Sequence, residues 1–330
     1  MNRSRILFLA RLALGLLLLA ALLLWEGNGR KLLTILAGLR WEYVPVLLAF
    51  PFLLMGVSCL KWRLFIDSGP VRVPLLQLMG IYAIGFFVNN FLPSMVGGDV
   101  TRAYVLGRKI GSGAHSLASV FLERATGFLA LIALCFTTLV FSPDLARDPM
   151  VVAGVLVMVG ACIALFLLIA IPQPLAVLPR RLASHPRVVK LAEMIQSFRG
   201  GVLAVRDRPG RVALAMAYSV AFHLLSGLNV YLAGLAIGLE ADLLKVIALS
   251  QIIFLVAALP ITINGLGLLE AACSLYLVRA GASPEQGLAI ALLIRLKTLG
   301  ISVVGGLLFG AERSPKANLP SAPAPSDPPA

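Results

Sequence analysis

The stretch "NNFLPSMVGGDVTRAYVLGRK", residues 89–109, places asparagines, a proline, glycines, an aspartate and an arginine directly after an apolar run. Pro93 removes a backbone donor and stops a helix. Gly97 and Gly98 permit a turn with unusual dihedral angles, after which Asp99 is predicted to cap a new helix. Non-helical backbone is tolerated at membrane depth only when it is buried in protein or lines a wet cavity. The stretch therefore predicts a broken, re-entrant helix.

The rest of the chain has the composition of a polytopic membrane protein. Of its 330 residues, 59% are hydrophobic and only 13% are charged, and a membrane-spanning helix needs about 20 apolar residues. Six runs are long enough: 6–25, 44–60, 117–141, 151–172, 212–238 and 286–311. Two more, 75–92 and 243–260, are shorter and end at a proline. The first run follows two arginines without a small-residue cleavage site, which favours a retained signal-anchor.

The distribution of positive charge sets the expected orientation. The net charge of +13 does not indicate nucleic-acid binding, because Lys and Arg cluster in a few loops. Segment 173–211 carries eight basic and two acidic residues, so it is predicted to be cytoplasmic. If 75–92 crossed the membrane completely, segment 173–211 would lie outside. If 75–92 instead forms a hairpin that enters from the cytoplasm and breaks at 89–98, segment 173–211 stays inside.

The same reasoning makes 243–279 a hairpin that enters from outside and breaks at 260–267. The fold prediction is therefore all-α, with about six full spans and two opposed re-entrant hairpins. The protein is expected in the cell inner membrane with both termini in the cytoplasm. One transmembrane domain, 1–311, includes the basic segment, where helical spacing predicts either a membrane-surface helix or a solvated linker helix. The Pro/Ala/Ser-rich tail, 312–330, is predicted to be disordered.

The second break reads "ALPITINGLGLLEAA", residues 258–272. Its proline is followed by Asn264 as a candidate helix cap, then by Gly265 and Gly267, with Glu270 on the new helix. The order of proline, glycines and acid matches the first break. This is compatible with a weak inverted repeat, in which transporters place substrate sites at paired broken helices, and equally with coincidence.

Charged residues within the apolar runs are candidate site residues. Glu123 and Arg124 are adjacent in one run and point about 100° apart on a helix, so they do not face each other. Arg295 lies in the last run. Each such charge costs at least ~2.5 kcal/mol to insert and needs a partner or a ligand. Arg102, beside a helix start, suits a lipid phosphate. The structural alternative pairs Glu123 with Arg102 or Arg295.

The remaining polar residues complete the predicted cavity. Asn89 and Asn90 are expected to cap or line the first break, while His223 and Asn229 are interpreted as interhelical hydrogen-bonding residues. Cysteines and histidines show no metal-ligand spacing, and neither a metal, a cofactor nor a catalytic residue is predicted. The candidate cavity residues are Asn90, Gly97, Gly98, Asp99, Arg102, Glu123, Arg124, Asn264, Gly265, Gly267, Glu270 and Arg295.

Four segments in order carry a family resemblance: residues 89–109, "SVFLERATGF", "LPITINGLGLLEAA" and "LLIRLKTLGISVVGGLL". Over about 43–311 the chain resembles the lysylphosphatidylglycerol synthase transmembrane region family. The resemblance implies a membrane domain that moves lipids, such as aminoacylated phosphatidylglycerol, between leaflets. Some members are fused to a soluble aminoacyl transferase, while others stand alone, including relatives tied to hopanoid or glycolipid pathways.

The resemblance carries over to individual positions. Those that match the family motifs are Asp99, Arg102, Glu123, Arg124, Glu270 and Arg295. Many relatives have a basic residue directly before the second acid, where this chain has Leu269, so a headgroup contact there is not carried over.

A lipid flippase or lipid transporter is the function the sequence predicts. The expected partner is a membrane lipid with an anionic phosphate headgroup or an aminoacylated or glycosylated lipid. No Walker motif is present, so ATP is not expected to drive transport directly. One alternative is a membrane-embedded enzyme of a lipid, hopanoid or glycolipid pathway. Another is an accessory scaffold that holds a separate transferase through 173–211.

Overall fold

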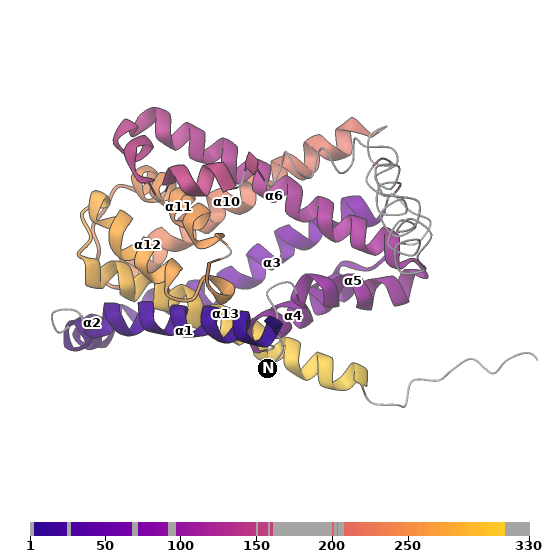
Figure 1. Cartoon of the computed structure of the whole chain (residues 1–330), viewed down its shortest axis with the longest axis horizontal. Coiled ribbons are helices and arrows are strands. Elements are labelled where there is room, and N and C mark those ends of the chain that lie inside the picture. Colours follow the sequence, from indigo (N-terminus) through magenta and orange to yellow (C-terminus); the bar gives the residue numbers. More distant parts are fainter. Residues whose placement is uncertain are drawn as a thin grey trace, which may run out of the picture.

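All regular structure in the described part of the chain is helical. A computed structural model describes residues 3–24, 28–67, 72–91, 97–149, 151–157, 159–160, 200, 203, 208–259 and 261–313. Among these residues, four helices are long and apolar enough to cross a membrane (Figure 1). They are α3 (Val44–Ile66), α6 (Gly113–Phe141), α10 (Pro209–Ala236) and α13 (Pro284–Arg313). The all-α membrane fold and four of the predicted spans are confirmed.

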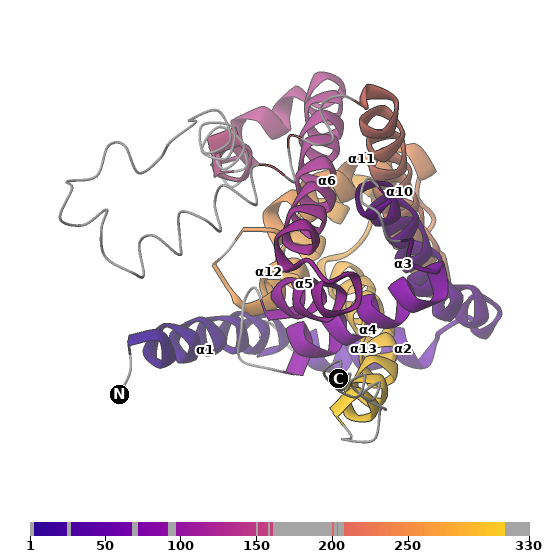
Figure 2. The same cartoon turned by 90° about the vertical axis from the view of Figure 1, so that its right-hand side faces the viewer.

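The other predicted spans are covered less completely. Helix α1 (Arg3–Leu24) occupies the first predicted span and lies on the outer side of the bundle in both views (Figure 2). Helix α2 (Asn28–Ala37) follows it and packs against α13. The predicted span 151–172 and the basic segment 173–211 lie mostly outside the described residues. Helix α13 continues two residues beyond the predicted boundary at 311, and 314–330 lie outside the described residues.

Two helical hairpins enter the bundle from opposite ends, as predicted. Helix α4 (Leu75–Phe91) and α5 (Gly97–Ile110) form the first, and α11 (Leu243–Ala257) and α12 (Leu268–Tyr276) form the second. In Figure 1 the first extends to the right and the second to the left, with both tips near the centre. The tips are joined where the Asn264 amide donates to the Asn90 side-chain oxygen.

The order of elements supports an inverted repeat. Helices α3–α4–α5–α6 recur as α10–α11–α12–α13, and the two hairpins point in opposite directions (Figure 1). Helix α12 begins 171 residues after α5 (268 against 97), and α13 begins 171 residues after α6 (284 against 113). Such agreement over two successive helices is far stronger than the two short sequence matches.

Glycines on α13 let the two repeats approach closely. A Cβ on Gly305 would lie 1.9 Å from the Ala83 carbonyl oxygen of α4, and one on Gly306 would lie 2.9 Å from the Phe87 ring. A Cβ on Gly300 would have nothing within 4 Å. Gly305 and Gly306 therefore pack closely against α4, whereas Gly300 does not take part in this contact. Small residues serve this purpose in membranes, where lipid is as apolar as the side chains.

Candidate functional site

A buried carboxylate on α6 stands between two cations. Glu123 is only 2% exposed, and its two oxygens lie 3.2 Å from Lys61 Nζ of α3 and 3.2 Å from Arg102 Nη2 of α5. Of the two predicted partners, Arg102 is therefore confirmed and Arg295 is wrong. Lys61 is a partner that the sequence did not predict, because the residue directly follows the apolar run 44–60. Helix α3 instead continues to Ile66 and buries it.

Asp99 joins this group through two arginines. Arg124 donates from Nε and Nη2 to the two Asp99 oxygens, both at 2.9 Å. Arg102 Nη2 donates to Asp99 at 2.7 Å. The predicted divergence of Glu123 and Arg124 is confirmed, since each has its own main partner and Arg124 Nε is 4.0 Å from Glu123. With Lys61, the network holds three cations and two carboxylates, so it carries one surplus positive charge.

Aromatic rings hold the guanidinium of Arg102 in place. Its Cζ lies 4.1 Å from the Tyr82 ring centroid and 5.1 Å from that of Trp62, within the range of cation–π attraction. A Cβ on Gly85 would lie 2.8 Å from Arg102 Cγ, so the side chain fits because α4 has a glycine there. Among the described residues, Arg102 Nη1 has no hydrogen-bond partner.

The start of α5 differs from the prediction. The helix begins at Gly97, and Asp99 lies within its first turn instead of capping it. The side chain of Asn89, at the end of α4, accepts from the Gly98 N–H at 2.9 Å. The close approach of α5 to α4 at this point requires a glycine at position 98, because a Cβ there would lie 2.4 Å from the Gly85 carbonyl oxygen. The prediction that Asp99 caps α5 is wrong, because its oxygens accept hydrogen bonds from Arg102 and Arg124. The prediction that Asn89 caps or lines the first break is confirmed.

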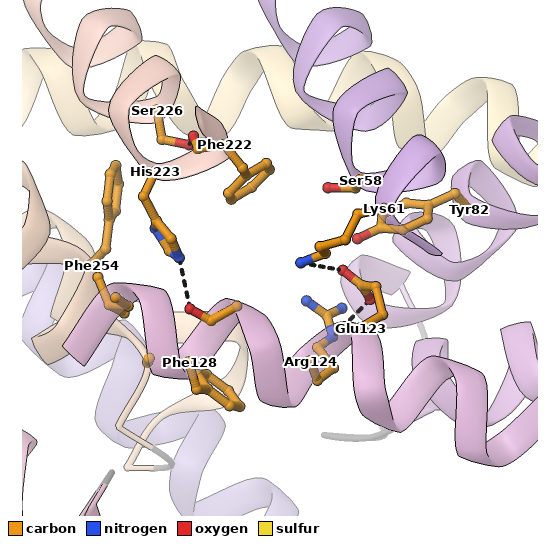
Figure 3. Close-up of a pocket in the computed structure, with 13 residues that line it drawn as sticks. Ser58, Lys61, Tyr82, Glu123, Arg124, Phe128, Phe222, His223, Ser226 and Phe254 are labelled. Atoms are coloured by element: carbon orange, nitrogen blue, oxygen red, sulfur yellow. Dashed lines mark hydrogen bonds and ion pairs between the residues drawn. The ribbon is translucent and has the colours of Figure 1, made fainter. Parts of the chain in front are cut away.

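A cavity of about 270 Å³ adjoins the charged network (Figure 3). Lys61, Glu123 and Arg124 line one end of it, and Phe128, Phe222, His223 and Phe254 line the other, as Figure 3 shows. Both Glu123 and Arg124 were predicted cavity residues. His223 forms the predicted interhelical hydrogen bond, to the Gly127 carbonyl of α6 at 3.1 Å. Its place in the cavity was not predicted.

The second hairpin carries its own ion pair. Arg295 Nε of α13 lies 2.5 Å from Glu270 Oε1 of α12, and Glu270 is fully buried. Glu270 Oε2 also accepts from the Gly267 N–H at 2.8 Å. Arg295 further donates to the Gly265 carbonyl at 3.2 Å. Four candidates of this break, Gly265, Gly267, Glu270 and Arg295, therefore form one cluster, and none of them lines the cavity of Figure 3.

Asn264 does not cap α12, contrary to the prediction. It lies in a short 3-10 turn with φ 49° and ψ 33°, and Gly267, with φ 77°, takes the N-cap position. The Glu270 carboxylate accepts the N–H there. Left-handed backbone is open to asparagine and glycine more than to other residues. Asn264 thereby directs its amide to Asn90, which in turn donates to Ser302 of α13 at 2.6 Å.

We expect the Asn90–Asn264 contact to couple the two hairpins weakly. Asn264→Gly keeps the left-handed turn accessible and removes only the amide. Together with Asn90→Ala it forms a double-mutant cycle. The expected coupling energy is about 0.5 kcal/mol, the lower end of the range for residues in contact. We expect the lower end because Asn264 is exposed. Denaturant titration of the protein in detergent measures it. Strictly additive effects would contradict the contact.

The two ion pairs occupy equivalent positions of the repeat. Arg124 follows Asp99 by 25 positions, and Arg295 follows Glu270 by the same 25. In both cases the acid is on the second arm of a hairpin and the arginine is on the next long helix. Buried Lys297, also on α13, donates to Asn229 of α10 at 2.8 Å, which confirms the predicted interhelical role of Asn229.

Comparison with known proteins matches this arrangement to one family. The sequence model described as "Lysylphosphatidylglycerol synthase TM region" matches residues 8–306, which include both hairpins and both ion pairs. The chain belongs to this family. The resemblance predicted from the four motifs is confirmed, and with it the assignment as a multi-pass membrane protein.

Two curated membrane proteins are similar to the chain over most of their own length. A UPF0104 membrane protein of Methanocaldococcus jannaschii is 28% identical over 68% of this chain and 92% of its own. A UPF0104 membrane protein of Methanothermobacter thermautotrophicus is 23% identical over 86% of this chain and 89% of its own. No solved structure matches the chain.

Proposed function

We propose that the protein moves a phospholipid or related polar lipid between the two leaflets of the membrane. The observation that carries this proposal is the surplus positive charge beside an intramembrane cavity. A lipid phosphate is the anion available at that depth. Arginine binds phosphate through paired N–H groups and lysine binds it as a point charge.

Arg124 is the residue best placed to bind the phosphate first. Its side chain is 41% exposed, whereas those of Arg102 and Lys61 are 1% and 4% exposed. It is already preorganised by Asp99 through two hydrogen bonds. A phosphate entering the cavity would share the guanidinium with Asp99 and reach Lys61 from the same side, without any buried charge being left unpaired.

The paired hairpins provide a route for alternating access. The two repeats meet at the Asn90–Asn264 contact, where broken helix ends come together. Rocking of one repeat against the other would open the region between the tips first to one leaflet and then to the other. Under the positive-inside rule, the basic last turn of α5 and both termini would face the cytoplasm.

Transport is proposed to leave the lipid chemically unchanged. Leaflet-resolved labelling and mass spectrometry of lipids from a deletion strain separate this from the other functions. Normal lipid composition with altered sidedness supports transport, whereas a missing lipid species supports an enzyme. If deletion of 173–211 abolished function while changes of the intramembrane charges did not, the protein would instead be a scaffold for a separate transferase.

Arg124→Gln is expected to lower lipid transport at least tenfold in reconstituted vesicles. The substitution removes a charged hydrogen-bond donor from the phosphate, and about 1.4 kcal/mol corresponds to a factor of ten. Transport is measured by chemical reduction of an acyl-labelled lipid in the outer leaflet. The matched control is Arg63→Gln on α3, whose arginine forms a partly exposed pair with Asp67. Equal transport by both variants would remove Arg124 from the mechanism.

A further inference from the structure

The cavity of Figure 3 has two chemically different ends. Lys61, Glu123 and Arg124 lie at one end, and at the other the rings of Phe222 and Phe254 flank His223 (Figure 3). None of the described residues that line this aromatic end carries a carboxylate. A phosphate seated at the charged end would therefore direct the remainder of its headgroup toward the rings.

The polar atoms at the aromatic end have acceptor capacity to spare. His223 Nε2 faces the Gly127 carbonyl at 3.1 Å; because a carbonyl only accepts, this nitrogen carries the proton and Nδ1 is an acceptor. That Nδ1 is buried and has no partner in the described part of the chain. The Ser226 hydroxyl donates to the Phe222 carbonyl at 2.7 Å and keeps its lone pairs. This end therefore suits a ligand that supplies hydrogen-bond donors.

Hydroxyl groups fit these acceptors better than an ammonium group does. Aromatic rings do attract cations. The charged wall, however, offers two cations against one carboxylate, and Glu123 already accepts from Lys61 and Arg102. An ammonium group would enter a cavity of like charge with no free counter-charge, at a depth where unpaired charges are costly. A hydroxyl group avoids that cost.

We infer that the aromatic end is a headgroup subsite for an uncharged polyol or sugar attached to the lipid phosphate. The inference rests on the proposed function, which puts the phosphate at the charged end. A volume of about 270 Å³ corresponds to roughly nine water molecules, which is room for a headgroup and not for acyl chains. The rings would pack against the C–H faces of the headgroup while its hydroxyls reach His223 and Ser226.

Gly127 lies between the two ends. It lines the cavity, its carbonyl binds His223, and a Cβ added to it would lie 3.4 Å from Lys61 Nζ. A leucine there would close off the aromatic end without removing any charged group. Gly127→Leu therefore tests the subsite separately from phosphate binding at the charged end of the cavity.

The experiment compares three acyl-labelled probes that differ only in the headgroup: phosphatidylglycerol, phosphatidylmethanol and phosphatidylethanolamine. Phosphatidylmethanol keeps the anionic phosphate and lacks hydroxyls. Binding to purified protein is measured by native mass spectrometry, and transport in vesicles by reduction of the label. Wild type is expected to prefer phosphatidylglycerol at least tenfold over both other probes.

Variants then locate the preference. Gly127→Leu and His223→Phe are each expected to reduce the binding and transport of phosphatidylglycerol to the level of phosphatidylmethanol. Binding and transport of phosphatidylmethanol should stay unchanged. Ser226→Ala should reduce the preference several-fold, whereas its matched control Ser219→Ala should keep it. Ser219 is on the same helix, is buried, and makes the same type of bond, to the Ala215 carbonyl at 2.9 Å.

The outcomes separate this inference from the proposed function. Preferential binding of phosphatidylglycerol without transport of any probe would contradict the transport function and keep the subsite. Equal binding of phosphatidylglycerol and phosphatidylmethanol by wild type, or a preference for phosphatidylethanolamine, would overturn the subsite. A preference that survives both Ser226→Ala and His223→Phe would overturn it as well, because the hydroxyls would then be recognised elsewhere.

Discussion

Glu123→Gln is expected to lower the free energy of unfolding by about 3–5 kcal/mol, the range for breaking one partner out of a buried ion pair. Glu123 is the only carboxylate that the described structure places within 4 Å of Lys61, and it is shared with Arg102. Both cations are almost fully buried. Glutamine keeps the shape and some hydrogen bonding but leaves Lys61 without a counter-charge and the network with two surplus positive charges.

The measurement is a denaturation titration of the purified protein in detergent, followed by circular dichroism. Asp67→Asn, directly after α3, serves as the control, because Asp67 forms a partly exposed i,i+4 ion pair with Arg63 worth about 0.3–0.5 kcal/mol. A loss below about 1 kcal/mol for Glu123→Gln would show that the network is not organised around this carboxylate. Added phosphate should partly restore the variant, since an anion can replace the lost charge.

Local signals in the sequence were sufficient to predict the two hairpins. The glycines and asparagines near 89–98 and 260–267 mark the breaks because they act on the backbone within a few residues. The caps predicted for Asp99 and Asn264 were wrong for a different reason. Asn89 reaches Gly98 across the break, and Glu270 reaches back to Gly267. Which of several polar side chains takes an N–H depends on the path of the turn, which neighbouring helices determine.

Partners within the charged network depended on tertiary packing. The position of Glu123 within an apolar run predicted that it needs a cation, but the sequence offered Arg102 and Arg295 equally as that partner. Lys61 was missed because apolarity predicts where a lipid-exposed span ends, not where the helix ends. A helix that packs inside a bundle can continue into polar residues when a partner lies opposite them, as α3 does at Lys61.

The repeat was hard to detect because most equivalent positions have diverged. At the 171-residue offset, Asp99 corresponds to Glu270 and Arg124 to Arg295, but Arg102 corresponds to Cys273. The ion pair between hairpin and long helix is thus kept in both halves, whereas Arg102 has no basic counterpart in the second half, and the charged end of the cavity is formed by residues of the first half. This difference is why we place the phosphate at the charged end of the cavity.

Gly305→Ala is expected to destabilise the protein by about 1–3 kcal/mol, the usual cost of overpacking a close contact. The added Cβ would lie 1.9 Å from the Ala83 carbonyl oxygen and 2.4 Å from its carbon. Both belong to the backbone, so no rotamer change relieves the overlap and α4 has to move away from α13. Thermal denaturation in detergent measures the loss.

Gly300→Ala on the same helix is the matched control. With nothing within 4 Å of its Cβ, it is expected to raise stability by up to about 1 kcal/mol, the helix preference of alanine over glycine. The opposite signs matter for function as well as for stability. Asn89 and Asn90 lie in the last turn of α4, so moving this helix would disturb the cap of α5 and the bond from Asn90 to Ser302 of α13. Gly305→Ala should therefore also slow transport, and if it left both stability and transport unchanged, the close contact of α4 with α13 would not be what positions the first hairpin.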